Sequence, residues 1–297
     1  MHILFRLEDR SVLQLHGEGT KALLKNLLCG DVRALEKESA LFSPMLNMQG
    51  GTMDNVLAFL HGGSCWLVVH EQSREKDLRH IARQADGGVS VQDRSADLRL
   101  YALMGPQAEE LLRNAPLFWK APSDHMGENV FLLCIDHNDV EALETEMARH
   151  GAVLCSQGDL DTLMIENGVP AYGRELDDTI NPLEAGLSRY VRLERPGFVG
   201  REALVAAGEP RRGVIGLVVE NAGAARGMNV VHRDKDVGMV TSACYSPRLR
   251  AHIALALVEK PYQDVGRRLK VECGEELLQA QVAALPFEAG EEQDDSE

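Results

Sequence analysis

The sequence lacks the features that define several common classes of protein. No apolar run approaches the roughly 20 residues that a membrane-spanning helix needs, so a helical membrane protein is excluded. The opening segment MHILFRLEDRSV carries charges where a secretory signal has its apolar stretch, and we therefore do not expect export. Walker loops, GxGxxG, GxSxG and kinase signatures are all missing, which removes the best-marked nucleotide-binding and hydrolase families.

Cysteine and histidine are present, but not at the spacings of metal or redox sites. None of the six cysteines forms a CxxC pair, and most stand in apolar runs such as FLLC and GAVLC. This usage is typical of a reduced, cytoplasmic protein whose cysteines act as small apolar side chains. The ten histidines form no HxH, HExxH or Cys/His cluster, so we expect no dedicated zinc or iron–sulfur site.

The chain has fewer positively charged than negatively charged side chains. The chain has 31 Lys and Arg against 46 Asp and Glu, which gives a formal net charge of −15. That balance argues against binding to nucleic-acid phosphates and against docking on an anionic membrane. Six of the acids fall within residues 288–297, EAGEEQDDSE, which we expect to form a disordered acidic tail.

Length and patterning indicate the fold class. The 297 residues are enough for two domains or three small ones. Strand, hairpin and helix patterns alternate through the first half, which favours an α+β fold over a doubly wound sheet. Two apolar runs flank His61-Gly62-Gly63-Ser64 and predict a hairpin over residues 55–69. Further strands are predicted at 11–16, 98–104 and 131–135, and helices at 17–29, 71–83, 108–112 and 140–150.

The pattern changes at about Gly213. From there to residue 287, short strand candidates follow one another closely with turn residues between them. Such a run predicts an all-β barrel or roll. The segment Val205–Pro210 is the expected linker ahead of this C-terminal lobe.

Three segments are dense in motif-like residues rather than periodic: Phe42–Asp54 (FSPMLNMQGGTMD), Asp161–Leu204 and Val237–Val258. At these residues the sequence resembles the glycine-cleavage T-protein (aminomethyltransferase) superfamily, which binds folate. The family's patterns there read roughly YSxMLNxxGGxxDD, YGQxxD followed by FxGxEAL, and ITSGxxSPxLxxxIALAxV. Two more stretches match in the family's order, since Val69–Leu78 is similar to VNxxxREKDL and Leu103–Ala108 to QGPxA. The resemblance covers about residues 10–287.

The resemblance implies an α+β fold with three lobes around a folate-sized channel. Residues 1–50 and 155–205 would form the central folate-binding lobe, 51–154 a ferredoxin-like α+β lobe, and 206–287 the C-terminal β-barrel lobe. The resemblance also implies tetrahydrofolate, or a one-carbon derivative of it, as the cofactor. A lipoyl-carrier or other protein is the implied partner.

The resemblance also assigns roles to individual residues. Glu166, in the apolar frame LMIENG, matches the pterin-binding glutamate, and a carboxylate can accept hydrogen bonds from the amino group and the ring N–H of a pterin. Asp54 and Asn55 match the Asp-Asp pair after Gly-Gly, whose second member is implicated in catalysis. Asparagine has no carboxylate to carry a proton, so Asp54 is the other candidate catalytic residue. The remaining expected cofactor contacts are Phe42, Met45, Asn47, Tyr172 and Arg226.

Each of these residues also has a structural interpretation. Asp54 could only shape the turn after Gly-Gly, and Glu166 could be an exposed loop carboxylate. Arg226 could meet a glutamyl carboxylate of folate or could be a solvated charge in its Gly/Ala-rich loop.

Three functions therefore stay open. The first is a tetrahydrofolate-dependent transferase of an aminomethyl or methyl group, favoured by the GREAL, NPLEAG and SPxL motifs. The second is a non-catalytic folate-binding or accessory protein, similar to the iron–sulfur-assembly branch of the superfamily. Asn55 favours it, as does the loss of both arginines of the family's ARDxxR at Asp159–Met164. However, that branch carries KGCYxGQE, and this chain has RPGFVGRE at Arg195–Glu202, without the cysteine. The third is an interaction module that binds no folate.

Overall fold

The computed structural model describes residues 2–35, 40–123, 125–127 and 129–288. The chain forms two compact units. Unit 1 comprises the described residues up to Leu160 together with Leu176–Pro182 and Leu187–Gly208. Unit 2 comprises Asp161–Glu175, Leu183–Gly186 and the described residues from Glu209 onward. The predicted acidic tail lies outside the described residues, except for Glu288.

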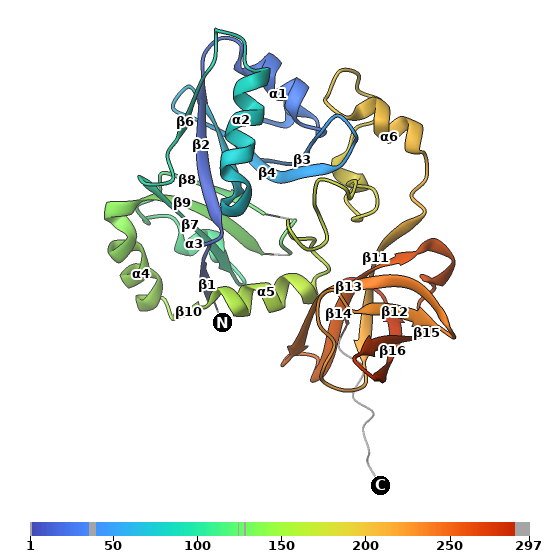
Figure 1. Ribbon diagram of the computed structural model, residues 1–297. Helices are drawn as coiled ribbons and strands as arrows, with labels where there is room; N and C mark the ends of the chain where they lie inside the picture. The colour runs from blue at the N-terminus through green and yellow to red at the C-terminus, as the bar shows by residue number, and fades with distance from the viewer. Residues whose placement is uncertain (1, 36–39, 124, 128, 289–297) are drawn as a thin grey trace. The chain divides into compact units, whose positions relative to one another are not determined.

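The first sheet of unit 1 is antiparallel, with the strand order β3-β4-β5-β2-β6 (Figure 1). The β4–β5 hairpin closes through Gly62 and Gly63, whose φ angles are 57° and 74°, and His61 pairs with Ser64 as the sequence predicts. Glycine suits both positions because a two-residue hairpin turn of this kind needs positive φ at its centre. The strands are β2 (Arg10–His16), β3 (Leu41–Leu46), β4 (Thr52–His61), β5 (Ser64–His70) and β6 (Ser90–Asp93).

Helices α1 (Thr20–Leu27) and α2 (Arg74–Gln84) pack on one face of this sheet (Figure 1). The buried leucines of α1 recur at helical spacing, so they form one apolar stripe. They share a core with Ile81 of α2 and with Val56 and Leu67 of the sheet. Single 3₁₀ turns, η1 (Val32–Leu35) and η2 (Glu71–Ser73), follow α1 and precede α2.

The second sheet of unit 1 has the order β10-β1-β7-β9-β8. Strand β1 pairs in parallel with β10 and antiparallel with β7, so it joins the first residues of the chain to much later ones. Helix α4 covers this sheet through Leu143 and Met147. The elements are β1 (His2–Arg6), β7 (Leu98–Met104), α3 (Ala108–Leu111), β8 (Trp119–Pro122), β9 (Val130–Asp136), η3 (His137–Asp139), α4 (Val140–Arg149) and β10 (Ala152–Cys155). Unit 1 also contains η4 (Ser188–Tyr190) and α6 (Arg201–Ala207).

Unit 2 is a closed barrel with the strand order β11-β14-β13-β12-β15-β16. Alternate residues of its strands point inward and fill the barrel with Val, Leu and Ala side chains. The strands are β11 (Arg212–Val219), β12 (Asn229–His232), β13 (Lys235–Ser246), β14 (Ala251–Glu259), β15 (Arg268–Cys273) and β16 (Glu276–Ala283), with η5 (Lys260–Tyr262) between β14 and β15. Helix α5 (Gln157–Glu166) carries the chain from unit 1 into unit 2.

The α+β architecture and the C-terminal barrel confirm the sequence-based expectation. Two details differ from it. Val205–Ala207, expected in a linker, form the end of α6, and the helix stops at Gly208. The expected boundary between residues 50 and 51 falls between β3 and β4, which pair with each other and so belong to one sheet. Within the described ranges, no helix has the length and apolar character needed to cross a membrane.

Candidate functional site

Strand β4 places Asp54 and Asn55 on opposite faces of its sheet, because side chains alternate along a strand. Asp54 lies on the face of Val56, which packs with α1 and α2. Asn55 lies on the face of Phe59, whose ring stacks on Trp119 of the second sheet at 3.7 Å between centroids. Both side chains are buried, with 0% of Asp54 and 8% of Asn55 exposed. The two candidate residues therefore lie in different environments, and only Asp54 carries a carboxyl group.

The Asp54 carboxylate is surrounded by hydrogen-bond donors. Its Oδ1 contacts Nδ1 of His70 at 2.5 Å and accepts from the backbone N–H of Asn55 at 2.7 Å. Its Oδ2 accepts from the backbone N–H of His70 at 2.9 Å and from Oγ of Ser73 at 2.7 Å. A buried carboxylate is stable only when donors of this kind replace its water. Asp54 does more than shape the turn, since it joins β4 to the end of β5 and to η2.

A second carboxyl group completes this cluster. Asp77, in the first turn of α2, is fully buried and lies close enough to Asp54 for the two carboxyl groups to influence each other's pKa. Burial raises the pKa of Asp77, and the charge of Asp54 raises it further. Burial also raises the pKa of Asp54, but its donors make it the member that holds the negative charge. Asp77 is thus the member of the pair that is expected to hold a proton.

Phe42 belongs to an aromatic cluster inside unit 1. Its ring stacks on the imidazole of His125 at 4.2 Å and meets the Tyr190 ring edge-on at 4.6 Å. Burial lowers the pKa of His125, and the charges of Arg10 and Arg189 lower it further, so this histidine is neutral near pH 7. Phe42 is 8% exposed, and the structure gives its ring a packing role.

Met45 and Asn47 hold local structure. Met45 has no exposed surface and packs in the core beneath α1. Asn47 donates from Nδ2 to the carbonyl of Asp178 at 2.8 Å, and its Oδ1 accepts from the backbone N–H groups of Gln49 and Gly51. Its amide therefore shapes the Gly-Gly loop and anchors it to the segment around Asp178.

Glu166 is the last residue of α5 and lies in unit 2. It is 4% exposed, so it is not the exposed loop carboxylate considered from the sequence. Its Oε2 accepts from Nε of Arg248 at 2.7 Å, and its Oε1 accepts from the hydroxyl of Ser246. Arg248 also donates to the carbonyl of Phe287 at 3.1 Å. Each carboxylate oxygen has a second lone pair, so Glu166 keeps acceptor capacity beyond these two bonds.

The other expected contacts of unit 2 lie in loops. Tyr172 is half-buried in the turn that follows α5, and Arg226 is exposed between β11 and β12. In the same turn Glu175 is 1% exposed, accepting from Oγ of Ser242 at 2.6 Å and from the backbone of Ala171 at 3.0 Å. Glu175 therefore ties this turn to the barrel strand β13.

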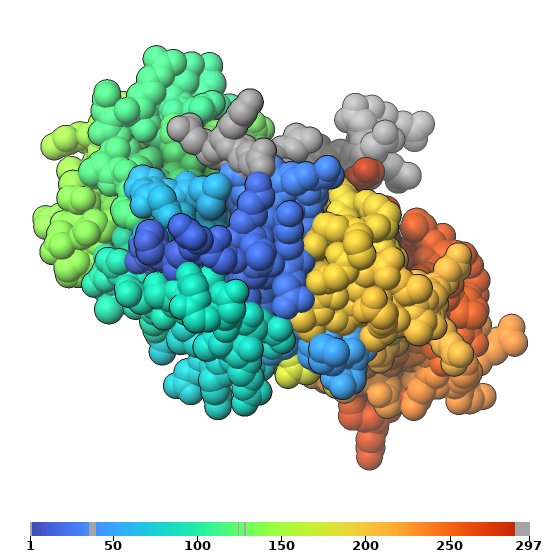
Figure 2. Space-filling model, turned by 90° about the horizontal axis from the view of Figure 1, so that it is seen from above, coloured from blue at the N-terminus to red at the C-terminus, as the bar shows by residue number. Residues whose placement is uncertain are grey.

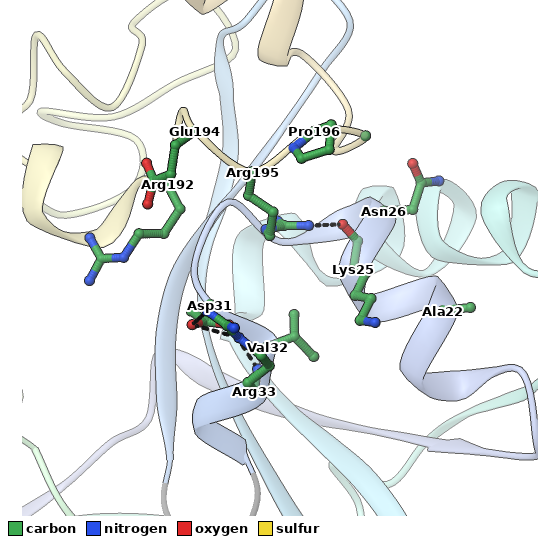
Figure 3. A pocket seen from close by; sticks show the side chains of 11 residues that line it. Ala22, Lys25, Asn26, Asp31, Val32, Arg33, Arg192, Glu194, Arg195 and Pro196 are labelled. Carbon is green, nitrogen blue, oxygen red and sulfur yellow. Dashed lines mark hydrogen bonds and ion pairs between the residues drawn. The ribbon is translucent and has the colours of Figure 1, made fainter.

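A separate hollow of about 580 Å³ in unit 1 lies between α1 and residues 192–197 (Figure 3). These two stretches adjoin on the molecular surface, in blue and gold in Figure 2. Arg195 donates to the carbonyl of Lys25 at 2.6 Å and to that of Leu28. These carbonyls end α1, so Arg195 caps the helix. Arg195 stands where the KGCYxGQE motif has its lysine, and in this chain its role is structural.

Sequence reasoning missed the partners of both buried carboxylates. His70, Ser73 and Asp77 fall in the stretch similar to VNxxxREKDL, and Ser246 and Arg248 fall in the SPxL motif. The signal that could have found them is the recurrence of polar side chains inside matched motifs. The sequence does not show which of these residues contact Asp54 and which contact Glu166.

Comparisons with known proteins agree with this arrangement. Residues 4–118 match the family model of the GCVT N-terminal domain, and residues 212–288 match that of the glycine cleavage T-protein C-terminal barrel domain. An aminomethyltransferase of Synechococcus elongatus is 32% identical over 317 residues, covering 97% of this chain and 85% of the relative. One of Moorella thermoacetica is 33% identical over 315 residues, covering 96% and 86%.

A solved structure agrees with the fold. The crystal structure of glycine cleavage system aminomethyltransferase T from Bartonella henselae matches with a TM-score of 0.86. The match has 21% identity and covers 97% of this chain and 86% of that one. The fold agrees with that of the solved structure, and the two family models and the relatives identify the same family. The chain belongs to the glycine-cleavage T-protein (aminomethyltransferase) family.

Proposed function

We propose that this protein is a tetrahydrofolate-dependent transferase that moves an aminomethyl or methyl group from a small or carrier-bound donor. The observation that carries the proposal is the fully buried carboxyl group of Asp54, held by donors from β5 and η2. Removing a charge from water costs several kcal/mol, and apolar residues of similar size would stabilise the fold at least as well. A carboxyl group kept at a fully buried position despite such a cost supports a chemical role.

The residues of unit 2 fit a pterin. Glu166 is buried, charged and has lone pairs beyond those used by Ser246 and Arg248. A pterin presents an amino group and a ring N–H side by side, which match those acceptors. Glu166 would hold the pterin, and Arg226 would meet the glutamyl carboxylate. Tetrahydrofolate supplies the amine that accepts the one-carbon unit.

The proposed role of the chain is largely one of positioning. Holding donor carbon and accepting amine together in a site without water can contribute about 7–11 kcal/mol to lowering the barrier. The donor follows from the relatives, which are named aminomethyltransferases. We therefore propose an aminomethyl group on a lipoyl-carrier protein as the donor and partner.

The test is binding followed by transfer, both with the full-length protein. Calorimetry with tetrahydrofolate should give binding that Glu166→Gln weakens. Glu184→Gln, which alters another unit 2 carboxylate paired with Arg212 at 2.8 Å, is the matched control and should bind normally. Absence of binding to the unaltered protein would contradict the proposal and support an interaction module.

A second function rests on one specific observation. Asn55 stands where the family pattern has its second aspartate, which favours a folate-binding accessory protein without transfer. Tight binding of tetrahydrofolate without formation of a one-carbon product would establish this alternative.

A further inference from the structure

The hollow in unit 1 between α1 and residues 192–197 has no part in the proposed function (Figure 3). Its volume of about 580 Å³ falls in the range of small-molecule sites, which is roughly 300–1,000 Å³. The chain as a whole is acidic, with 46 Asp and Glu against 31 Lys and Arg. The lining of the hollow has the opposite balance, since four of its side chains are basic and two are acidic. A basic hollow in an acidic protein points to an anionic ligand.

We propose that this hollow binds a small organic phosphate, that is, a phosphate monoester with an apolar body. The charges that hold the phosphate are those of Lys25, from α1, and Arg195, from the segment that follows η4. The hollow shares no residue with the site proposed for folate, so the inference does not depend on the proposed function.

Four of the six charged residues compensate one another. The guanidinium of Arg33 donates from Nε and Nη2 to the carboxylate of Asp31, at 2.9 and 2.7 Å, and this pairing lowers the pKa of Asp31 to about 2. Arg192 and Glu194 have opposite charges and lie at the side of the hollow away from Lys25 (Figure 3). Lys25 and Arg195 remain, and among the residues that the structure describes neither forms an ion pair with a carboxylate.

Arg195 is held in place by acceptors that carry no full charge. Its guanidinium donates to the carbonyls of Lys25, at 2.6 Å, and of Leu28. The carbonyl end of a helix carries about half a negative charge, so it offsets only part of the arginine's charge. Burial lowers the pKa of Arg195 more than the nearby Asp31 and Glu194 raise it, yet a guanidinium stays protonated near pH 7. An anion in the hollow would therefore stabilise this cation.

The charges and walls of the hollow favour a phosphate over a carboxylate. A phosphate monoester carries about −1.5 to −2 charges near pH 7, which matches two cations that a helix end partly offsets. Its three terminal oxygens can accept from α1 and from the segment 192–197 together, whereas a carboxylate has two oxygens in one plane and a single charge. Ala22, Val32 and Pro196 supply apolar surface for the body of the ligand.

Calorimetry of the full-length protein with phenyl phosphate tests the proposal. Lys25→Gln should raise the Kd at least about tenfold, because it removes a cation and its charge-assisted hydrogen bond. Asp31→Asn should lower the Kd at least about twofold, since it removes the negative charge beside Arg33. The new amide oxygen can still accept from the backbone N–H of Arg33, a bond of 3.1 Å, so the local turn is kept. Lys21→Gln, on α1 but outside the lining of the hollow, is the matched control and should leave the Kd unchanged.

Two further probes test the class of ligand. Inorganic phosphate should bind more weakly than phenyl phosphate because it has no apolar body, and phenylacetate should bind more weakly because it carries one charge. Absence of phenyl phosphate binding, or an equal Kd in Lys25→Gln and the unaltered protein, would overturn the proposal. Equal affinity for inorganic phosphate would indicate an adventitious ion only, and equal affinity for phenylacetate would indicate a carboxylate site, so either result would overturn it too. None of these outcomes bears on transfer to tetrahydrofolate.

Discussion

Arg248 donates from Nε to Oε2 of Glu166 at 2.7 Å, although the two residues are 82 positions apart in the chain. The contact ties the end of α5 to the turn after β13. It also gives Glu166 a structural duty beside the one proposed for the pterin.

Glu166→Gln should therefore weaken both folate binding and the fold. The amide offers one acceptor oxygen and places a donor toward other donors. We expect the Kd for tetrahydrofolate to rise at least about tenfold, which is about 1.4 kcal/mol. The Tm should fall as well, because a buried carboxylate loses its arginine partner. Calorimetry and thermal unfolding measure the two effects.

Arg248→Gln separates these effects, since it removes the ion pair and keeps the carboxylate. Its Tm should fall while folate binding persists. Equal folate affinity in Glu166→Gln and the unaltered protein would show that the pterin binds elsewhere.

The buried Asp54–Asp77 pair predicts how stability varies with pH. The pKa of Asp77 in the folded state is raised above its unfolded value, so the folded state binds more protons above about pH 4. Stability from this group is complete below that pH and falls as pH rises, by up to about 1.4 kcal/mol per pH unit. Asp77→Asn keeps the size of the side chain but cannot ionise. In chemical denaturation from pH 4 to 9, the free energy of unfolding of the variant should rise relative to that of the unaltered protein as pH rises.

The exposed Asp236 provides the control for that series. Asp236→Asn should follow the unaltered protein at every pH. A constant difference between Asp77→Asn and the unaltered protein across the range would mean that Asp77 is ionised in the folded state.

The close packing of the Gly-Gly loop predicts a loss of stability when Gly51 is given a side chain. A Cβ on Gly51 would lie 1.8 Å from the carbonyl oxygen of Asp178, so the loop and that segment would have to separate. Gly51→Ala should cost about 2–4 kcal/mol of unfolding free energy, in the range of overpacked sites. Gly87, where a Cβ would meet nothing within 4 Å, is the control. Gly87→Ala should unfold at the same denaturant concentration as the unaltered protein, and an equal loss in both variants would refute the packing argument.

Local patterns predicted those elements whose cause is local. The hairpin at Gly62 and Gly63 follows from its turn residues, and α1 follows from its leucine stripe. Strand β1 was missed because its five residues carry no clear alternation and pair with β7 and β10 far along the chain. Helix α5 was missed because its apolar residues do not form one stripe.

In the candidate site, too, local patterns indicated individual residues but not the contacts between distant parts of the chain. The matched motifs indicated Asp54 as a candidate catalytic residue and Glu166 as a candidate pterin-binding residue, and the structure buries both. Their partners could not be predicted, since His70 meets Asp54 only once β4 and β5 form a hairpin, and Arg248 meets Glu166 only once the barrel closes. Contacts made by folding do not follow from the spacing of residues.

We propose above all that this chain transfers a one-carbon unit to tetrahydrofolate. The most direct measurement is a single-turnover reaction of the full-length protein with tetrahydrofolate and an aminomethyl-loaded lipoyl carrier, followed by quantifying the one-carbon folate. We expect product in proportion to enzyme, and at least about tenfold less product with Glu166→Gln at subsaturating folate. Saturating folate binding with no product above the enzyme-free reaction would show that this chain is not a transferase.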